Sequence, residues 1–535
     1  MKTSKHIFLN GASAATSETI NNPKLKNLTM KTTMRPSTVL GVALMCALAV
    51  ATAHGADAPK MKMSTDIPSS ITIPDEVPTR LGTLKFTDGF PDDATVQKVY
   101  DNLDFQHAVQ AYLTGLPAVS IQGGRLGLTG LGPANQTVAI SETLLDSKSL
   151  FLTANTTTPY TVVWLDLTNG PLVMEVPPMI LGPLDDAWFR WVTDVGITGP
   201  DKGKGGKYLL LPPGYKGQIP DGYFVAHSRT FEQLLFFRTF LKDGDPKPGV
   251  DSVKKFFRVY PLADATHPPA MKFVNISGKA FNTIGPADYT FWEAMNHVIQ
   301  HEPSDAMDPI TLGYFASLGI EKGKPFAPDA RMKAILTEAA AVGDATARTI
   351  TYKNRMKEAY FYPDSAWLTA FIGGSYKFEE NNARILDAYS MFFFYATGIT
   401  PAMSERMVGK GSQYAAAFVD SKGAPLDGGK TYKIHMPPNI PVNNFWSFTV
   451  YDNQTRSMLQ TDQQFPSVGS LTKGLQINDD KSVDVWFGPK APAGKETNWV
   501  QTVPGKGWNT LLRLYGPLEP WFDKTWRPGE IEFVK

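Results

Sequence analysis

The spacing of hydrophobic positions along the chain alternates between a helical period and a strand period. Apolar residues that recur every three or four positions predict helices, and the segments concerned are 96–113, 229–241, 288–301 and 328–348. Short runs with two-residue alternation predict strands. They are 161–167, 172–176, 187–194 and 207–211, followed much later by 432–436, 445–452, 482–487 and 511–515. The pattern therefore predicts a β-rich region, a helical middle and a second β-rich region.

Residues that favour turns mark the boundaries of these elements. Thr168 to Pro171 contain Asn-Gly, which tolerates positive φ and predicts a hairpin between strands 161–167 and 172–176. The glycine-rich segment 122–127 predicts a loop after the first helix, and residues 56–95, rich in Pro, Thr and Asp, predict an irregular lead-in.

The elements together predict a multidomain α+β fold whose C-terminal part is an antiparallel β-sandwich. The roughly 480 residues after position 55 exceed one ordinary core, so we expect two or three domains. The predicted regions are an extension plus signal peptide at 1–55, the lead-in at 56–95, a β-rich domain at 96–222, a mainly helical region at 223–409 and the C-terminal domain at 410–535.

An apolar run near the beginning of the sequence predicts export. Val39 to Val50 is uninterrupted, Lys31 and Arg35 precede it, and small residues follow it. This order is typical of a secretory signal peptide, here over about residues 30–55, and it predicts a periplasmic or secreted location. No second apolar stretch reaches the roughly 18 residues that a membrane-spanning helix needs.

Composition and charge narrow the classes of function. The sole cysteine, Cys46, lies inside the predicted signal, so removal of that segment excludes disulfides, thiolate metal sites and cysteine nucleophiles. Without residues 1–55 the chain has 46 basic and 50 acidic residues, a formal net charge of −4, which argues against nucleic acid as a partner. We expect no cofactor, and the sequence leaves the oligomeric state open. A small molecule or a glycan is the expected kind of ligand.

Two sets of motifs resemble known protein families. The stretch Asn155 to Tyr160 (NTTTPY), with the Leu-Asp-Leu and Gly-Pro that follow it, resembles the module called domain of unknown function 1254. Asn444 to Ser447 (NFWS) and Arg513 to Pro517 (RLYGP) resemble its usual partner, domain of unknown function 1214. The resemblance covers roughly 95–220 and 425–533. It implies a β-rich N-terminal domain, a helical spacer and a C-terminal jelly roll, and it implies no established reaction. The family often has an acidic residue where Thr157 stands, so no role of that acid transfers to this chain.

One predicted strand carries a candidate binding motif. Trp188, Arg190 and Asp194 fall at alternate positions of 187–194 and would share one face of the strand. An arginine beside a tryptophan can stack on a ring and bind a carboxylate. The alternative is an ion pair within the protein.

Our first hypothesis is a binding protein whose pocket lies between the two β domains. Asn155 and Tyr160 would donate hydrogen bonds, Arg190 would engage an acidic group, and aromatic rings would stack on a polar, aromatic or sugar-like ligand. The candidate ligand-binding residues are Asn155, Tyr160, Trp188, Arg190, Trp446 and Arg513.

The second hypothesis is a cofactor-independent hydrolase or lyase that acts on a polysaccharide or a small metabolite. Asp166 or Asp194 would serve as general acid or base, and Arg190 would stabilise charge. A third class, a structural protein of the cell envelope, predicts no binding pocket.

Two histidines have a spacing that can bind metal. His297 and His301 are one helical turn apart, but the glutamate that follows the first histidine of a metalloprotease motif is absent. Both point away from the apolar face of their predicted helix. We therefore expect a pair that faces solvent, and no metal site.

Overall fold

The computed structural model describes residues 61–535 and divides the chain into two compact units at residue 72. The predicted signal peptide lies outside the described residues. All elements discussed below belong to the second unit, 73–535. They confirm the predicted fold class, a multidomain α+β protein with a β-rich N-terminal region and a β-rich C-terminal domain. No helix among the described residues has both the length and the apolar character to cross a bilayer.

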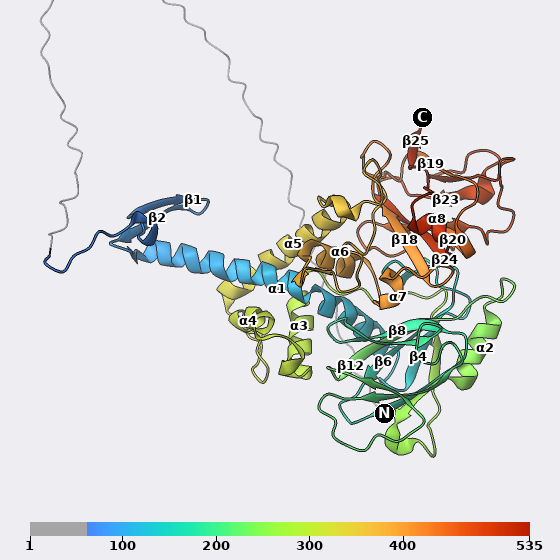
Figure 1. Cartoon of the computed structure of the whole chain (residues 1–535), viewed down its shortest axis with the longest axis horizontal. Coiled ribbons are helices and arrows are strands. Elements are labelled where there is room, and N and C mark those ends of the chain that lie inside the picture. Colours follow the sequence, from blue (N-terminus) through green and yellow to red (C-terminus); the bar gives the residue numbers. More distant parts are fainter. Residues whose placement is uncertain (1–60) are drawn as a thin grey trace, which may run out of the picture. The chain divides into compact units, whose positions relative to one another are not determined.

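A long helix connects the beginning of this unit to the N-terminal β region (Figure 1). Helix α1 spans Asp93–Thr129 and follows a three-stranded antiparallel sheet of β1 (Glu76–Thr79), β2 (Gly82–Thr87) and β3 (Phe90–Pro91). The Asp92 side chain caps the helix by accepting the Thr95 N–H at 2.7 Å. Residues 76–91 were expected to be irregular.

The N-terminal β region consists of two sheets around one apolar core. In order across the larger sheet, its strands are β14 (Lys272–Asn275), β4 (Thr137–Ile140), β6 (Tyr160–Asp166), β12 (Glu232–Arg238), β8 (Leu181–Asp186) and β9 (Trp191–Gly196). The smaller sheet has the order β11 (Phe224–His227), β10 (Gly206–Leu211), β7 (Leu172–Val176) and β13 (Arg258–Pro261). Helix α2 (Lys247–Phe256) packs on β7, and β5 (Ser149–Leu150) pairs with β15 (Phe281–Asn282).

The middle helices pack on α1 and form a second core with it. They are α3 (Thr290–His301), α4 (Pro309–Ser317), α5 (Ala330–Tyr352) and α6 (Leu386–Tyr395), followed by the short α7 (Pro401–Ser404). A small hairpin of β16 (Glu379–Glu380) and β17 (Ala383–Arg384) precedes α6. The helices predicted over 96–113, 288–301 and 328–348 correspond to α1, α3 and α5.

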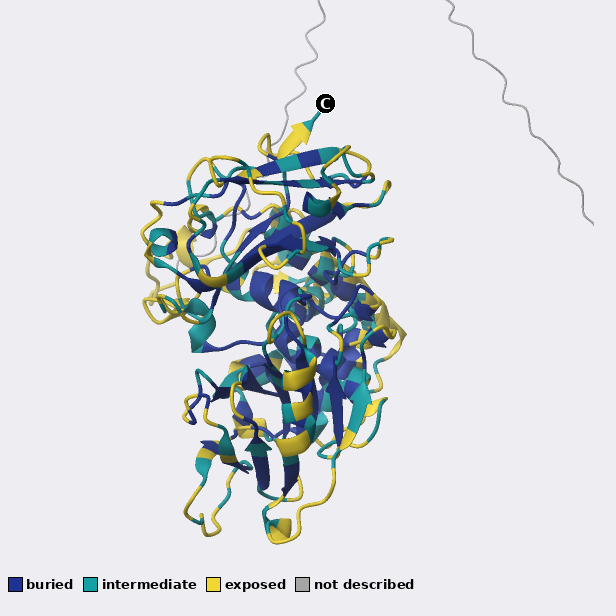
Figure 2. Cartoon of the chain, turned by 90° about the vertical axis from the view of Figure 1, so that its right-hand side faces the viewer, coloured by how far each residue is buried: buried dark blue, intermediate teal, exposed yellow. Residues whose placement is uncertain are grey.

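The C-terminal domain is a sandwich of two four-stranded sheets, as predicted. One sheet has the order β18 (Ser412–Ala417), β24 (Trp508–Pro517), β20 (Val442–Asp452) and β21 (Ser467–Gly469). The other has the order β23 (Trp499–Gln501), β22 (Val483–Gly488), β19 (Thr431–Met436) and β25 (Glu532–Val534), and α8 (Glu519–Phe522) follows β24. Apolar residues of both sheets fill the space between them. The strands of both β regions are mostly buried, and exposed positions gather on the loops (Figure 2).

The helix predicted over 229–241 is wrong, because this segment forms β12. The run Leu234 to Phe237 is continuously apolar, and a short run of this kind fits a strand covered on both faces as well as a helix. Strand β12 lies between β6 and β8, and both of its faces are covered.

The strand predicted over 187–194 is also wrong as a single element. Strand β8 ends at Asp186, β9 begins at Trp191, and the tight turn between them holds Phe189 at a φ of 57°. The predicted hairpin of 161–167 with 172–176 fails as well. The turn forms, but β6 and β7 enter different sheets.

The predicted loop 122–127 is part of α1, and its glycines allow a close approach of another segment. A Cβ on Gly123 would lie 2.4 Å from the Gly285 nitrogen, and one on Gly127 would lie 2.2 Å from the Asn282 carbonyl oxygen. A Cβ on Gly124 would instead meet only the Leu234 side chain, at 3.5 Å. Gly123 and Gly127 therefore allow the helix to pack directly against the backbone of residues 282–285.

We expect Gly123→Ala to lower the free energy of unfolding by about 1–3 kcal/mol, because the added methyl overlaps fixed backbone. Gly124→Ala is the matched control and should be neutral or stabilising, since alanine favours a helix over glycine by about 1 kcal/mol. Urea denaturation of both variants checks the order, and equal stability of the two would contradict it.

Candidate functional site

One face of the C-terminal sandwich carries polar side chains instead of apolar ones. Arg513 of β24 lies between Tyr414 of β18 and Ser447 of β20, which are its direct cross-strand neighbours. Two residues further along β24, Tyr515 lies next to Ser412. Because cross-strand neighbours point to the same side of a sheet, these side chains share one face.

This polar face packs against the N-terminal β region. The Arg513 guanidinium donates to the Thr153 carbonyl and, at 2.7 Å, to the Tyr451 hydroxyl. The Tyr451 hydroxyl donates to the Ala154 carbonyl at 2.7 Å. From the other side, Arg238 at the end of β12 donates to the Ser412 hydroxyl at 3.2 Å. The two β regions therefore meet through hydrogen bonds.

The motif Asn155 to Tyr160 lies at the same interface. The Asn155 side-chain oxygen accepts the backbone N–H groups of Thr157 and Thr158 at 2.9 and 3.0 Å, which fixes the turn. The Asn155 N–H donates to the Tyr160 hydroxyl at 3.0 Å. Tyr160 is the cross-strand neighbour of Arg238. The motifs that indicated the two families therefore converge in space.

We call the group at this interface the Arg–Tyr cluster: Tyr160, Arg238, Tyr414, Tyr451, Arg513 and Tyr515. Arg513 lies 5.3 Å from the ring centre of Tyr414, and Arg238 lies 5.6 Å from that of Tyr515. Within the described part of the chain, neither arginine forms a salt bridge with a carboxylate. Buried charges are costly unless they are paired. The protein groups that contact these two guanidinium charges are thus hydroxyls, rings and a carbonyl, and none of them is a carboxylate.

The two guanidinium charges and burial shift the pKa values of the cluster tyrosines in opposite directions. Burial raises the pKa of Tyr414, but the Arg238 and Arg513 charges outweigh burial and leave that pKa below its ordinary value of 10.0. Burial dominates at Tyr160 and Tyr451 and raises the pKa of each. Tyr414 therefore loses its proton more readily than Tyr160 or Tyr451.

Four buried polar atoms of the motif residues have no hydrogen-bond partner among residues 61–535. They are Asn155 Nδ2, Ser447 Oγ, Arg513 Nε and the Tyr515 hydroxyl. Buried polar atoms are rarely left unpaired in proteins, so a group of them calls for an explanation. Beside the cluster, Arg238, Ser412 and Tyr414 line a cavity of about 60 Å³, which has room for a few water-sized groups.

The structure places Trp188 and Arg190 elsewhere, at a cavity of about 630 Å³. Both residues belong to the turn after β8 and do not alternate along a strand. Arg190 binds the buried Asp186 carboxylate at 2.7 and 2.8 Å and donates to the Ala306 carbonyl at 2.6 Å. The alternative of an internal ion pair is the one observed.

The two candidate aspartates lie apart from each other. Asp166 accepts the N–H and hydroxyl of Thr168 at 2.8 and 2.5 Å, and hydrogen bonds from His301 and Thr168 outweigh burial and lower its pKa to about 2. Asp194 is buried and accepts a hydrogen bond from the indole N–H of Trp191 at 2.9 Å. Burial raises its pKa. Arg190 forms its salt bridge with Asp186, so the structure does not bring Arg190 together with either candidate.

Trp446 belongs to the apolar core of the C-terminal sandwich and is buried there. Its neighbours in sequence point to the polar face, as alternation along β20 requires. The structure therefore joins Asn155, Tyr160 and Arg513 of the candidate binding residues, and separates Trp446 from them.

The predicted solvent-facing histidine pair is half-buried instead. His297 Nε2 lies 2.9 Å from a Glu232 oxygen, and His301 Nε2 lies 3.8 Å from Asp166 and 3.2 Å from the Thr168 hydroxyl. The imidazoles face carboxylates because β12 and β6 lie where the helix was expected to border solvent.

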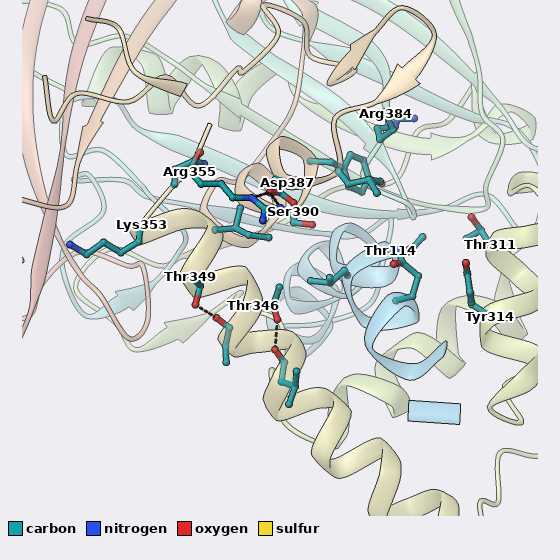
Figure 3. Close-up of a pocket in the computed structure, with 18 of the residues that line it drawn as sticks. Thr114, Thr311, Tyr314, Thr346, Thr349, Lys353, Arg355, Arg384, Asp387 and Ser390 are labelled. Carbon is teal, nitrogen blue, oxygen red and sulfur yellow. Dashed lines mark hydrogen bonds and ion pairs between the residues drawn. The ribbon is translucent and has the colours of Figure 1, made fainter. Parts of the chain in front are cut away.

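Another cavity, of about 780 Å³, lies among the helices (Figure 3). Its polar groups mostly bond within the protein. Thr346 and Thr349 donate to carbonyls of their own helix at 2.7 and 2.8 Å, and Arg355 pairs with Asp387 at 2.9 Å (Figure 3). This cavity offers room but few unpaired groups, so the Arg–Tyr cluster is the stronger candidate site.

The fold and the site define a multidomain α+β protein whose two β regions share a positively charged interface. Residues 135–261 match the family described as "Protein of unknown function (DUF1254)". Residues 411–519 match "Protein of unknown function (DUF1214)". The chain therefore carries both modules in the predicted order, and a motif of each contributes to the cluster, Tyr160 from the first and Arg513 and Tyr515 from the second.

A solved structure shares the fold. The VPA0106 protein from Vibrio parahaemolyticus is 19% identical, with a TM-score of 0.50 over 81% of this chain and 100% of that chain. An uncharacterized protein from Burkholderia cenocepacia is 11% identical, with a TM-score of 0.37 over 82% of this chain and 96% of that chain. No curated protein matches the sequence.

We expect Arg238→Met to leave the free energy of unfolding unchanged or to raise it by about 1–3 kcal/mol, since it removes a partly buried charge that has no carboxylate partner among the described residues. Asp186→Asn is the control, because it takes the carboxylate from Arg190 and should cost about 2 kcal/mol. Urea denaturation measures both values. A larger loss in Arg238→Met than in Asp186→Asn would contradict this account of the cluster.

Proposed function

We propose that this protein binds a small organic acid at the Arg–Tyr cluster, with the ligand carboxylate between Arg238 and Arg513. The observation that carries the proposal is a pair of guanidinium groups, Arg513 buried and Arg238 partly buried, without a carboxylate partner among the described residues. An anionic ligand would supply the missing charge and accept hydrogen bonds from both arginines.

The unpaired atoms support the same ligand. Asn155 Nδ2 and Arg513 Nε are donors, and the hydroxyls of Ser447 and Tyr515 can donate as well. A ligand group with several acceptor oxygens could accept hydrogen bonds from donors of this kind. The 60 Å³ cavity fits a carboxylate group, and its apolar residues, such as Phe236 and Met403, suit the carbon skeleton of the ligand. An exported binding protein is the form of this proposal that agrees with the predicted signal peptide.

A second candidate function is a cofactor-independent lyase at the same site. The lowered pKa of Tyr414 favours it, because a phenolate is a better proton acceptor than a phenol. Tyr414 would take the proton from the carbon next to the bound carboxylate. The electron pair left behind would move onto the carboxylate, where both arginines stabilise it. Its return would form a double bond between the α and β carbons of the ligand, while the bond from the β carbon to a leaving group such as hydroxide breaks and that group departs with the bonding electron pair. The buried Asp194 lies near Thr198 and Thr400, two residues that line the cavity.

Binding is tested by a thermal-shift screen of acetate, pyruvate, succinate and benzoate, with benzamide as the uncharged counterpart of benzoate. A ligand at 100 times its Kd should raise the free energy of unfolding by about 2.7 kcal/mol. We expect the stabilisation to vanish in Arg238→Met and Arg513→Met, because each removes a charge that holds the carboxylate. Arg190→Met, at the 630 Å³ cavity, is the control and should keep it. Absence of a shift with all four acids, or a shift that Arg238→Met retains, would contradict the proposal.

The state of Tyr414 predicts a pH dependence. Its folded pKa is below the ordinary value of 10.0, so its contribution to stability is fully present above pH 10.0 and is lost as pH falls through the folded pKa. We expect the stability of the wild type relative to Tyr414→Phe to rise with pH over that window. An ultraviolet difference titration should show phenolate in the wild type below pH 10.0. Tyr432→Phe is the control, because burial raises the pKa of Tyr432. Identical titrations of the wild type and Tyr414→Phe below pH 10.0 would exclude Tyr414 as the base.

A further inference from the structure

A second cluster of polar side chains lies at the opposite end of β12, where the strand meets the end of α3. Glu232 is the first residue of β12, His301 is the last residue of α3, and Glu302 follows it. Potential ligand atoms of these three residues all lie within 4.8 Å of one another. His297, one turn earlier on α3, lies 2.9 Å from Glu232 Oε2, and its ring stacks on that of His301 at 5.5 Å.

We propose that Glu232, His301 and Glu302, together with His297, bind a divalent transition-metal ion such as Zn²⁺. Two imidazoles and two carboxylates form a nitrogen and oxygen donor set that suits zinc and cobalt, whereas magnesium prefers oxygen ligands alone. The site is independent of the Arg–Tyr cluster and of the function proposed for it.

The surroundings hold the carboxylates in place. Glu302 accepts the backbone N–H groups of Phe231 and Glu232 at 2.6 and 2.9 Å. The Glu232 carboxylate accepts the Trp164 indole N–H and the Gln122 amide, both at 3.3 Å. Hydrogen bonds of this kind orient metal ligands and reduce the cost of assembling the site.

The charge balance points to a cation. Asp166, Glu232 and Glu302 bring three carboxylates together, and among residues 61–535 their only salt-bridge partners are the two histidines. No lysine or arginine of the described chain forms a salt bridge with any of them. A divalent ion would compensate two of the three charges without requiring either imidazole to be protonated.

Access and room also fit an ion. The two glutamates are buried, whereas the His297 and His301 side chains remain 32% and 27% exposed, so an ion can enter past the imidazoles. On the far side, Glu302 lines a cavity of about 200 Å³ together with Trp188. The Trp188 indole N–H is buried and has no partner among the described residues. A group bound to the ion would have space there.

The test is a titration of the full chain, stripped with chelator, with Co²⁺ followed by absorbance and with Zn²⁺ followed by calorimetry. We expect one ion per chain, with a cobalt spectrum that reports nitrogen and oxygen ligands. His301→Ala and Glu232→Gln should weaken binding by about tenfold or more. The control is His435→Ala, because His435 and Asp484 form an exposed imidazole–carboxylate pair at 2.8 Å outside the site.

Each result decides the proposal. Binding that is lost in His301→Ala and Glu232→Gln and kept in His435→Ala supports it. Absence of stoichiometric binding, or binding that His301→Ala leaves intact, overturns it. If His301→Ala does not fold, as judged by circular dichroism, His297→Ala and Glu232→Gln decide in its place. Glu232→Gln is nearly isosteric, and His297 lies on the exposed side.

Discussion

The register between β12 and β6 is the interaction on which both clusters depend. All seven residues of β12 pair with β6, from Glu232 opposite Asp166 to Arg238 opposite Tyr160. A shift by one residue would turn every side chain of β12 to the other face. The hydrogen-bond ladder therefore holds an acidic residue at one end of the strand, near His297 and His301. At the other end it holds Arg238 against the C-terminal sandwich.

The polar interface between the two β regions stabilises the fold less than an apolar interface would. A face of β18, β24 and β20 that packs on another domain would be most stable if it were apolar, as the opposite face is. It carries Arg513, Tyr515 and Ser447 instead, each with a buried polar atom that has no partner among the described residues. Polar groups left unpaired in a core are costly, and functional sites are the places where proteins retain them. This cost is the physical reason to regard the interface as a site and not as a packing surface.

Much of the fold follows from the sequence, and part of the site does. Alternation and turn residues predict the C-terminal strands because one face of each is buried, and the motifs around Asn155 and Arg513 predict the two families. The roles of Arg238 and Glu232 could not be predicted. The apolar run between them has no periodicity that distinguishes a strand from a helix, so the two ends of β12 could not be located. The partners of Arg190 could not be predicted either. The turn after Asp186 depends on the positive φ of Phe189, which the local sequence pattern does not indicate. What the sequence lacks in each case is the pairing of distant segments.

The length of β12 limits how the two clusters can act together. Glu232 and Arg238 point to the same face, and six residue steps of about 3.3 Å separate them by roughly 20 Å. A ligand small enough for the 60 Å³ cavity cannot reach from the arginines to the glutamates. An ion at Glu232 would therefore not act as a Lewis acid on an acid bound at Arg238. Any influence of one site on the other would have to pass through the strand, by holding the start of β12 against α3 while its end positions Arg238. The two clusters thus share a scaffold and not a reaction centre, and each can be tested without disturbing the chemistry of the other.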